Sequence, residues 1–190
     1  MASIIDKGQI ILQDGSVMTW CITDDEVLTI SGALWDGPVA VGKDIKSDAK
    51  FRHLVLDDSV KAIGIFNFSD WDQVEEVTLP PSITCIPHAA FSGCKNLKRV
   101  HLPEGLETIG ADSFLGCSSL ETIKLPSSLK EILEFSFSGT GIAEVTAPWK
   151  EPITIEMESF PEDTIIRVPK EALKAYSKAD GWKDYTLVRQ

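Results

Sequence analysis

The sequence predicts a mainly β solenoid built from short repeats and closed by a different element at each end. Three observations carry this prediction: a period of 23 residues, a phenylalanine that returns at one place in each unit, and a proline that follows each short apolar–polar alternation. A unit of this size cannot bury its own apolar side, but it can do so against its neighbours. Stacking is therefore what lets such a chain fold.

The period is explicit in the middle of the chain. Segments 74–96 and 97–119 are each 23 residues long and align without gaps, and segment 120–141 follows with 22. Two slots extend this register over five to six turns of the solenoid, which we call coils, between residues 51 and 168. The first slot holds Phe68, Phe91, Phe114, Phe137 and Phe160, and the second holds Leu54, Val77, Val100, Ile123, Val145 and Ile166.

Each unit starts with an apolar–polar alternation that is typical of a half-buried strand. Proline ends the alternation, as in Leu102-Pro103, because it has no N–H to donate to a strand ladder. A second apolar pair follows, Leu106 and Ile109 in one unit, and then a turn that Gly116 closes. We expect a short parallel sheet on one side of the solenoid and turns or short 3₁₀ segments on the other, with each phenylalanine lying on the next.

The chain before the repeats predicts an antiparallel N-terminal cap. Residues 8–32 contain three apolar–polar runs separated by turn signals at Asp14-Gly15 and Asp24-Asp25. Residues 33–50, rich in Gly, Asp and Lys, are typical of a connecting loop. We therefore assign residues 1–50 to this cap and its loop, and 51–168 to the repeats.

The chain after the repeats predicts a C-terminal cap over 169–190. Pro169 stands at a plausible first helical position, Leu173 and Tyr176 are three residues apart, and Gly181 is a stop signal. We expect a short helix over roughly 169–179. All three parts form one structural domain.

Composition excludes several classes of function. With 29 acidic and 18 basic residues, the net charge of −11 argues against binding nucleic acid, which needs a basic surface. No run of about 18 apolar residues is present, so we expect no membrane span. The first residues lack the pattern of a signal peptide. We expect a monomer.

Cysteine and histidine residues do not form a recognisable reactive site. Cys94 and Cys117 occupy the same position of successive repeats, and Trp71 occupies that position one repeat earlier. Because cysteine and tryptophan are interchangeable there, we predict that the two thiols are buried, reduced and part of the packing. His101 alternates with apolar neighbours and is expected to point outward, away from the inward Cys94 slot. Zinc needs four converging ligands, and catalysis needs a nucleophile with a base within reach. We predict no metal, no cofactor and no catalytic residues.

One surface stands out as a candidate binding site, the outward face of the strand ladder. Arg99, His101 and Lys124 form a basic spot on two neighbouring coils of an acidic protein, which suggests an anionic partner. The alternative is an ordinary solvated strand face. The candidate set on this face is Glu76, Thr78, Arg99, His101, Thr122, Lys124 and Arg167.

Several stretches resemble a known family. "AAFSGCKNLKRVHLPEGLETIG" and "DSFLGCSSLETIKLPSSLKEI", with the closing "VPKEALKAYSKADGW" and the opening "WCITDDEVLTISG", are similar to the BspA-like leucine-rich repeats of bacterial surface proteins. The resemblance covers nearly the whole chain and implies a leucine-rich-repeat solenoid. It also implies display at the cell surface and adhesion or protein binding, without a shared ligand or catalytic residue.

The function that we predict is non-enzymatic recognition of a protein or glycan through the outward sheet face. Two alternatives remain open. The chain is a structural spacer within a larger assembly, or it is a metal-dependent module that uses Cys85, His88 or His101. Fold analogy alone does not decide between a binder and a spacer.

Overall fold

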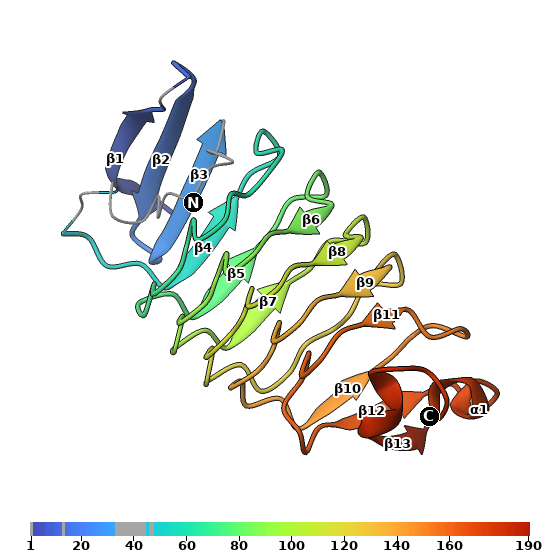
Figure 1. The fold of residues 1–190 in the computed structure, drawn as a ribbon. Helices are drawn as coiled ribbons and strands as arrows, with labels where there is room; N and C mark the ends of the chain where they lie inside the picture. Colours follow the sequence, from blue (N-terminus) through green and yellow to red (C-terminus); the bar gives the residue numbers. More distant parts are fainter. Residues whose placement is uncertain (1, 13, 33–44, 46–47) are drawn as a thin grey trace.

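The computed structural model describes residues 2–12, 14–32, 45 and 48–190. Over this part the chain forms a stack of coils with a β cap at the N-terminal end and a partly helical cap at the C-terminal end (Figure 1). The fold class predicted from the repeats is confirmed. Most of the connecting loop expected at 33–50 lies outside the described residues.

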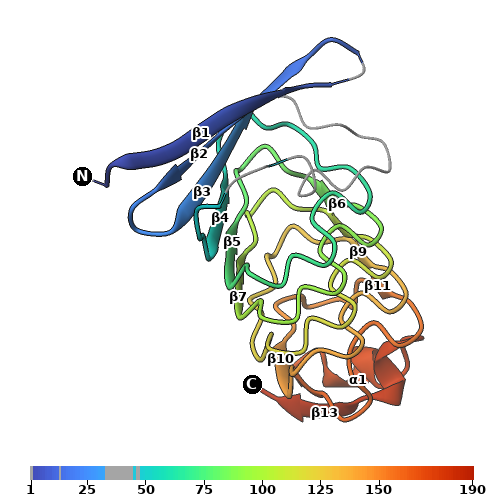
Figure 2. The ribbon, with the colours of Figure 1, turned by 90° about the vertical axis from the view of Figure 1, so that its left-hand side faces the viewer.

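The N-terminal cap is the antiparallel three-stranded element that the turn signals predict. Strands β1 (Ile4–Ile11), β2 (Val17–Thr23) and β3 (Val27–Gly32) pair in that order. Figure 2 shows β1 and β2 reaching beyond the first coils. Strand β3 then pairs in parallel with the first strand of the repeats, so cap and solenoid share one sheet.

The front sheet continues from the cap through the first three coils. Strands β4 (His53–Leu56), β5 (Glu76–Thr78) and β7 (Arg99–His101) pair in parallel and in register, so that residues 23 apart are neighbours. A second front sheet contains β10 (Glu144–Thr146), β12 (Ile165–Val168) and β13 (Thr186–Arg189).

Between these two sheets the front ladder is interrupted, which corrects the prediction of one continuous sheet. Residues 122–124 occupy the strand slot but are not a strand, and Figure 1 draws no arrow between β7 and β10. The strand slots 100 and 123 are 23 residues apart, whereas 123 and 145 are 22 apart and 145 and 166 are 21 apart. The phenylalanine slots keep 23 throughout, so the front segments slip relative to the core after this coil.

The opposite side carries a second parallel sheet, which the sequence reading took for turns or 3₁₀ segments. Its strands have only two residues each: β6 (Cys85–Ile86), β8 (Thr108–Ile109), β9 (Glu131–Ile132) and β11 (Thr154–Ile155). Each strand buries a single isoleucine. A two-residue strand is too short to show an alternation, so no pattern in the sequence identified it.

The core is a column of stacked phenylalanine rings, as the repeat slot predicts. Neighbouring rings lie 5.2 to 5.5 Å apart between centroids and are inclined by only 2° to 14°. All five side chains are at most 1% exposed. At the C-terminal end the column meets Tyr185 and Trp182 of the cap.

Four coils turn beside this column through two left-handed residues, and the last of the five turns through one. The first slot holds non-glycine residues with φ of 51° to 57°: Phe66, Ala89, Asp112, Phe135 and Glu158. The second, four residues later, has φ of 60° to 76° and is filled by Asp70, Gly93, Gly116 and Gly139. Glycine adopts this conformation without steric cost, which explains why the turn signal of the sequence falls on Gly116.

The C-terminal cap contains less helix than predicted. Helix α1 is Leu173–Tyr176 rather than 169–179. The Ala172 N–H donates to the Pro169 carbonyl in a preceding turn, and Ala172 provides no side-chain cap. The short 3₁₀ segment η2 (Trp182–Asp184) follows Gly181, and Trp182 is fully buried. Strand β13, which no signal predicted, then pairs with β12.

Candidate functional site

The predicted front-face residues meet around one carboxylate. Glu76 on β5 accepts a hydrogen bond from Arg99 Nη2 at 2.7 Å and lies 2.6 Å from His101 Nε2, both on β7. His53 Nε2 lies 2.8 Å from the Thr78 hydroxyl beside them. The parallel register brings these side chains together because residues 76 and 78 pair with 99 and 101.

Glu76 changes the electrostatics of the predicted basic spot. The Arg99 guanidinium first, and then His101, lower the pKa of Glu76 to about 2. Glu76 in turn raises the pKa of Arg99. An ionised carboxylate therefore offsets the charge of Arg99, so the spot is less basic than the count of cations suggests.

The remaining predicted residues are placed differently. Thr122 and Lys124 are exposed on the interrupted coil, and within the described residues Lys124 has no ion pair. Arg167 belongs to the second front sheet, where its Nε donates to Glu144 at 2.5 Å. The structure thus brings Glu76, Arg99 and His101 into one network, with Thr78 beside it in contact with His53, and leaves Arg167 in another.

A second charged row, which the sequence reading did not identify, runs beside the first. Arg52 contacts Glu26 at 2.8 Å and Glu75 at 2.7 Å, and Lys98 contacts Glu75 at 2.7 Å. Lys98 and Arg52 lower the pKa of Glu75. The 23-residue spacing of 52, 75 and 98 was the signal available in the sequence.

A hollow of about 450 Å³ lies where this charged row reaches the interrupted coil. Its lining combines two cations, one carboxylate and three hydroxyl groups, from Lys98, Arg99, Glu121, Ser118, Ser119 and Thr122. Only Arg99 and Thr122 belong to the predicted set. The other four lining residues lie between the turn and the strand position of their repeat. In that segment the repeat pattern does not predict whether a side chain points inward or outward.

The cysteines of the repeat slot are buried, free thiols, as predicted. Cys94 Sγ lies 3.1 Å from the Phe68 carbonyl oxygen, and Cys117 Sγ lies 3.1 Å from that of Phe91. A hydrogen bond from Cys94 and burial both raise the pKa of the Cys117 thiol. The raised pKa makes the Cys117 thiol a poor nucleophile. Both side chains are buried and contribute to packing.

The residues of the metal alternative do not converge. Cys85 is on the back sheet and His101 is on the front sheet, while His88 Nδ1 lies 3.6 Å from Asp112 Oδ2 in a turn. Across the described ranges, no group of three or more His, Cys, Asp or Glu side chains is arranged to hold a metal ion.

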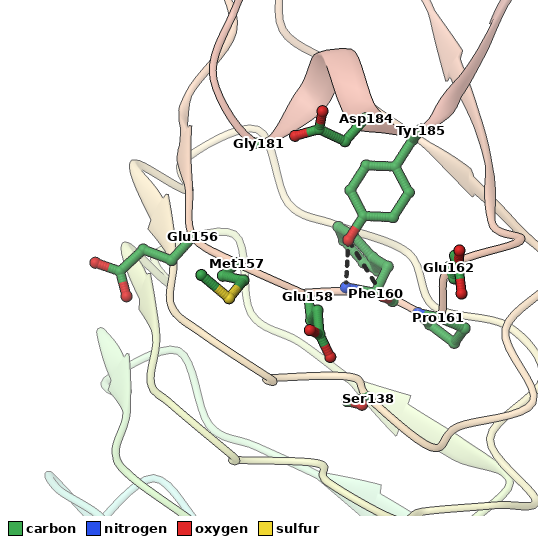
Figure 3. Close-up of a pocket in the computed structure, with 10 residues that line it drawn as sticks. All are labelled: Ser138, Glu156, Met157, Glu158, Phe160, Pro161, Glu162, Gly181, Asp184 and Tyr185. Atoms are coloured by element: carbon green, nitrogen blue, oxygen red, sulfur yellow. Dashed lines mark hydrogen bonds between the residues drawn. The ribbon is translucent and has the colours of Figure 1, made fainter.

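A second hollow of about 450 Å³ lies at the C-terminal end, where the aromatic column meets the cap (Figure 3). Carboxylates surround it, from Glu156, Glu158, Glu162 and Asp184. Tyr185 is fixed there, because its hydroxyl lies 3.0 Å from the Phe160 nitrogen and 3.2 Å from the Phe160 oxygen. The Tyr185 ring packs against Phe160 at the end of the phenylalanine stack, and it forms one wall of the hollow.

These features define a leucine-rich-repeat type of solenoid with an exposed polar sheet face. The family model described as the BspA type leucine-rich repeat region matches residues 41–166 in six copies, and the chain belongs to this family. Comparison with curated proteins gave no match. In the described part of the chain, no helix is long and apolar enough to cross a membrane.

Solved bacterial structures share the fold. A leucine-rich repeat protein from Eubacterium ventriosum is 20% identical with a TM-score of 0.61, over 82% of this chain and 43% of that protein. The T. pallidum leucine-rich repeat protein is 20% identical with a TM-score of 0.60, over 97% and 80%. A leucine-rich cell surface protein from Faecalibacterium prausnitzii is 21% identical with a TM-score of 0.51, over 84% and 54%. The chain thus spans less than half the length of the first of these proteins.

Proposed function

We propose that this chain is a non-enzymatic binding module that recognises a protein or glycan through the outward face of its front sheet. One observation carries the proposal. The Glu76 network holds Arg99 and His101 in defined positions on a rigid sheet, while their side chains remain 63% and 56% exposed. Side chains that are ordered before binding lose less conformational entropy when a partner docks.

The shape of the solenoid supports the same proposal. Stacked coils present an extended surface on which successive strands offer side chains at regular intervals, and solenoid proteins bind partners on such surfaces. Here β5 and β7 present two polar side chains each in register, beside His53 of β4. The mixed charge of this surface suits a polar partner better than a strongly anionic one.

Surface display is part of the proposal. The Faecalibacterium prausnitzii relative is described as a cell surface protein. Membership of the BspA-type family is in accord with the same location for this chain and with a role in adhesion.

The test is a binding screen against extracellular-matrix proteins, mucins and glycans, repeated with the double reversal Arg99→Glu and Lys124→Glu. The matched control reverses Lys130 and Lys178, which lie outside the front sheet. Each double variant changes the net charge equally and removes one ion pair, Arg99–Glu76 in the first and Lys130–Glu107 in the second. Thermal unfolding would confirm that both variants fold.

We expect the control to retain binding and the Arg99/Lys124 variant to lose most of it. Equal binding by both variants would remove this face from the function. A screen without any partner at micromolar concentration would favour the structural spacer instead.

A further inference from the structure

The hollow beside the interrupted coil is rich in unused hydrogen-bond donors. In the described part of the chain, the main-chain N–H and C=O groups of residues 121–125 make no hydrogen bond. The equivalent groups of β5 and β7 are paired in the ladder. Of these residues, Glu121 and Thr122 are exposed and line the hollow, and peptide N–H groups that secondary structure does not use are available to an acceptor on a ligand.

The side chains of the hollow add further donors. Arg99 uses two of its N–H groups on Glu76, and Lys98 uses one on Glu75, so each cation keeps donors for another acceptor. The hydroxyls of Ser119 and Thr122 have no hydrogen-bond partner among the described residues. Ser118 Oγ makes only a long contact of 3.4 Å with the Lys95 carbonyl oxygen.

Glu121 supplies the one carboxylate of this arrangement, a stronger acceptor than the neighbouring carbonyl and hydroxyl oxygens. It is exposed, and it lines the same hollow as the two cations. A ligand that fits must therefore present a negative group to Lys98, Arg99 and the peptide N–H groups, and hydroxyl donors to Glu121. A sugar that carries a carboxylate has both features on one ring.

We propose that this hollow binds a carboxylated sugar residue, with the carboxylate at Lys98, Arg99 and the Thr122 N–H and with ring hydroxyls at Glu121 and Ser119. The inference rests on the proposed function, because it names the ligand class for one end of the same front face. It does not require that every partner of that face be a glycan.

The experiment titrates isotope-labelled protein with three probes and follows its amide NMR signals. 3′-Sialyllactose carries a sialic acid, a hyaluronan tetrasaccharide carries glucuronic acid, and lactose carries no carboxylate. We expect one or both acidic sugars to shift the amide signals of residues 119–124, while lactose leaves them unchanged. The acidic probe that acts identifies the source of the carboxylate.

Two single variants test the assignment of the hollow. Lys98→Gln removes a cation that lines it, and Lys130→Gln removes a cation from a similar exposed pair, Lys130–Glu107 at 2.8 Å, away from it. We expect Lys98→Gln to weaken binding of the acidic sugar about fivefold, the effect of one exposed charge contact. Lys130→Gln should leave the affinity unchanged.

Equal shifts with lactose, no shift at 119–124 with either acidic sugar, or equal loss in both variants would overturn the inference. Its failure is distinguishable from failure of the proposed function. If the screen finds a protein partner whose binding depends on Arg99 and Lys124, the front face remains a binding surface although the hollow takes no sugar.

Discussion

The aromatic column and the front ladder follow the same coils but differ in regularity. Five phenylalanine rings stack without a break from the first coil to the last, at almost constant spacing. The front ladder, in contrast, is divided at residues 122–124 into two sheets. The core therefore tolerates no change of period, whereas the surface ladder does.

The column and the ladder differ in regularity because a change of spacing costs them different contacts. A displaced ring would leave a void in a dry interior, where no other group replaces the lost contacts. A displaced strand leaves peptide groups at a surface where water satisfies them. The column therefore constrains the period of the core, and the front face tolerates a change of spacing.

The largest expected effect is on the column. Phe114→Ala should lower the free energy of unfolding by about 3 to 5 kcal/mol, because Phe114 is fully buried between two other rings. Ile123→Ala in the interrupted coil should cost only about 1 to 2 kcal/mol, because Ile123 is half-buried. Urea denaturation of the two variants measures the difference. Equal costs would contradict the view that the column dominates stability.

A smaller effect distinguishes two serines next to the column. Ser136 Oγ lies 2.6 Å from the Leu133 carbonyl oxygen and 2.9 Å from that of Gly110. Ser113 Oγ, in the same slot one coil earlier, is buried without a partner in the described residues. Ser136→Ala should cost about 1 kcal/mol, the value of a typical hydrogen bond.

The matched variant Ser113→Ala should be neutral or stabilising by up to about 1 kcal/mol, because it removes a buried hydroxyl that has no partner. Thermal unfolding under identical conditions compares the two. Equal destabilisation by both substitutions would mean that the loss of stability does not depend on the hydrogen bonds of the serine hydroxyl.

The smallest effect concerns the front face and depends on pH. Glu76→Gln should cost about 0.5 to 1 kcal/mol near neutral pH, because exposed partners weaken the ion pairs of Glu76. The pKa of Glu76 is lowered from 4.5 to about 2 in the folded protein. Its stabilisation is therefore present above about pH 4.5 and is lost as the pH falls through about 2.

Urea denaturation of wild type and Glu76→Gln at several pH values between neutrality and about pH 2 measures this dependence. The two curves should converge in acid. A difference that stays constant over the whole range would show that Glu76 acts through packing rather than charge.

The sequence predicted the column well because one residue type marks it in every unit. It predicted the front strands through β7 for a similar reason, since alternation and a terminal proline recur there. The interruption escaped prediction because residues 122–124 have the same pattern as 99–101. The shortened spacing that accompanies it appears only in the following unit.

The outward direction of Arg99 and His101 was predicted from the alternation, but the charge around them was not. Arg99 and His101 were counted as cations, although an in-register parallel ladder places Glu76 beside Arg99. The hollow was not predicted, because it depends on the interrupted coil and on residues outside the strand slots. The charge exposed on such a face therefore depends on which side chains the pairing of neighbouring coils brings together, and not only on the residues of one coil.

The stacked phenylalanines have a consequence for how the gene of such a protein changes. Each of the three inner rings meets an identical ring above and below, so the inner coils offer their neighbours the same aromatic contact. Duplicating or deleting one 23-residue unit leaves matching surfaces at the junction. Unequal recombination between repeats can therefore lengthen or shorten the array, and renew the exposed residues, without requiring a new core.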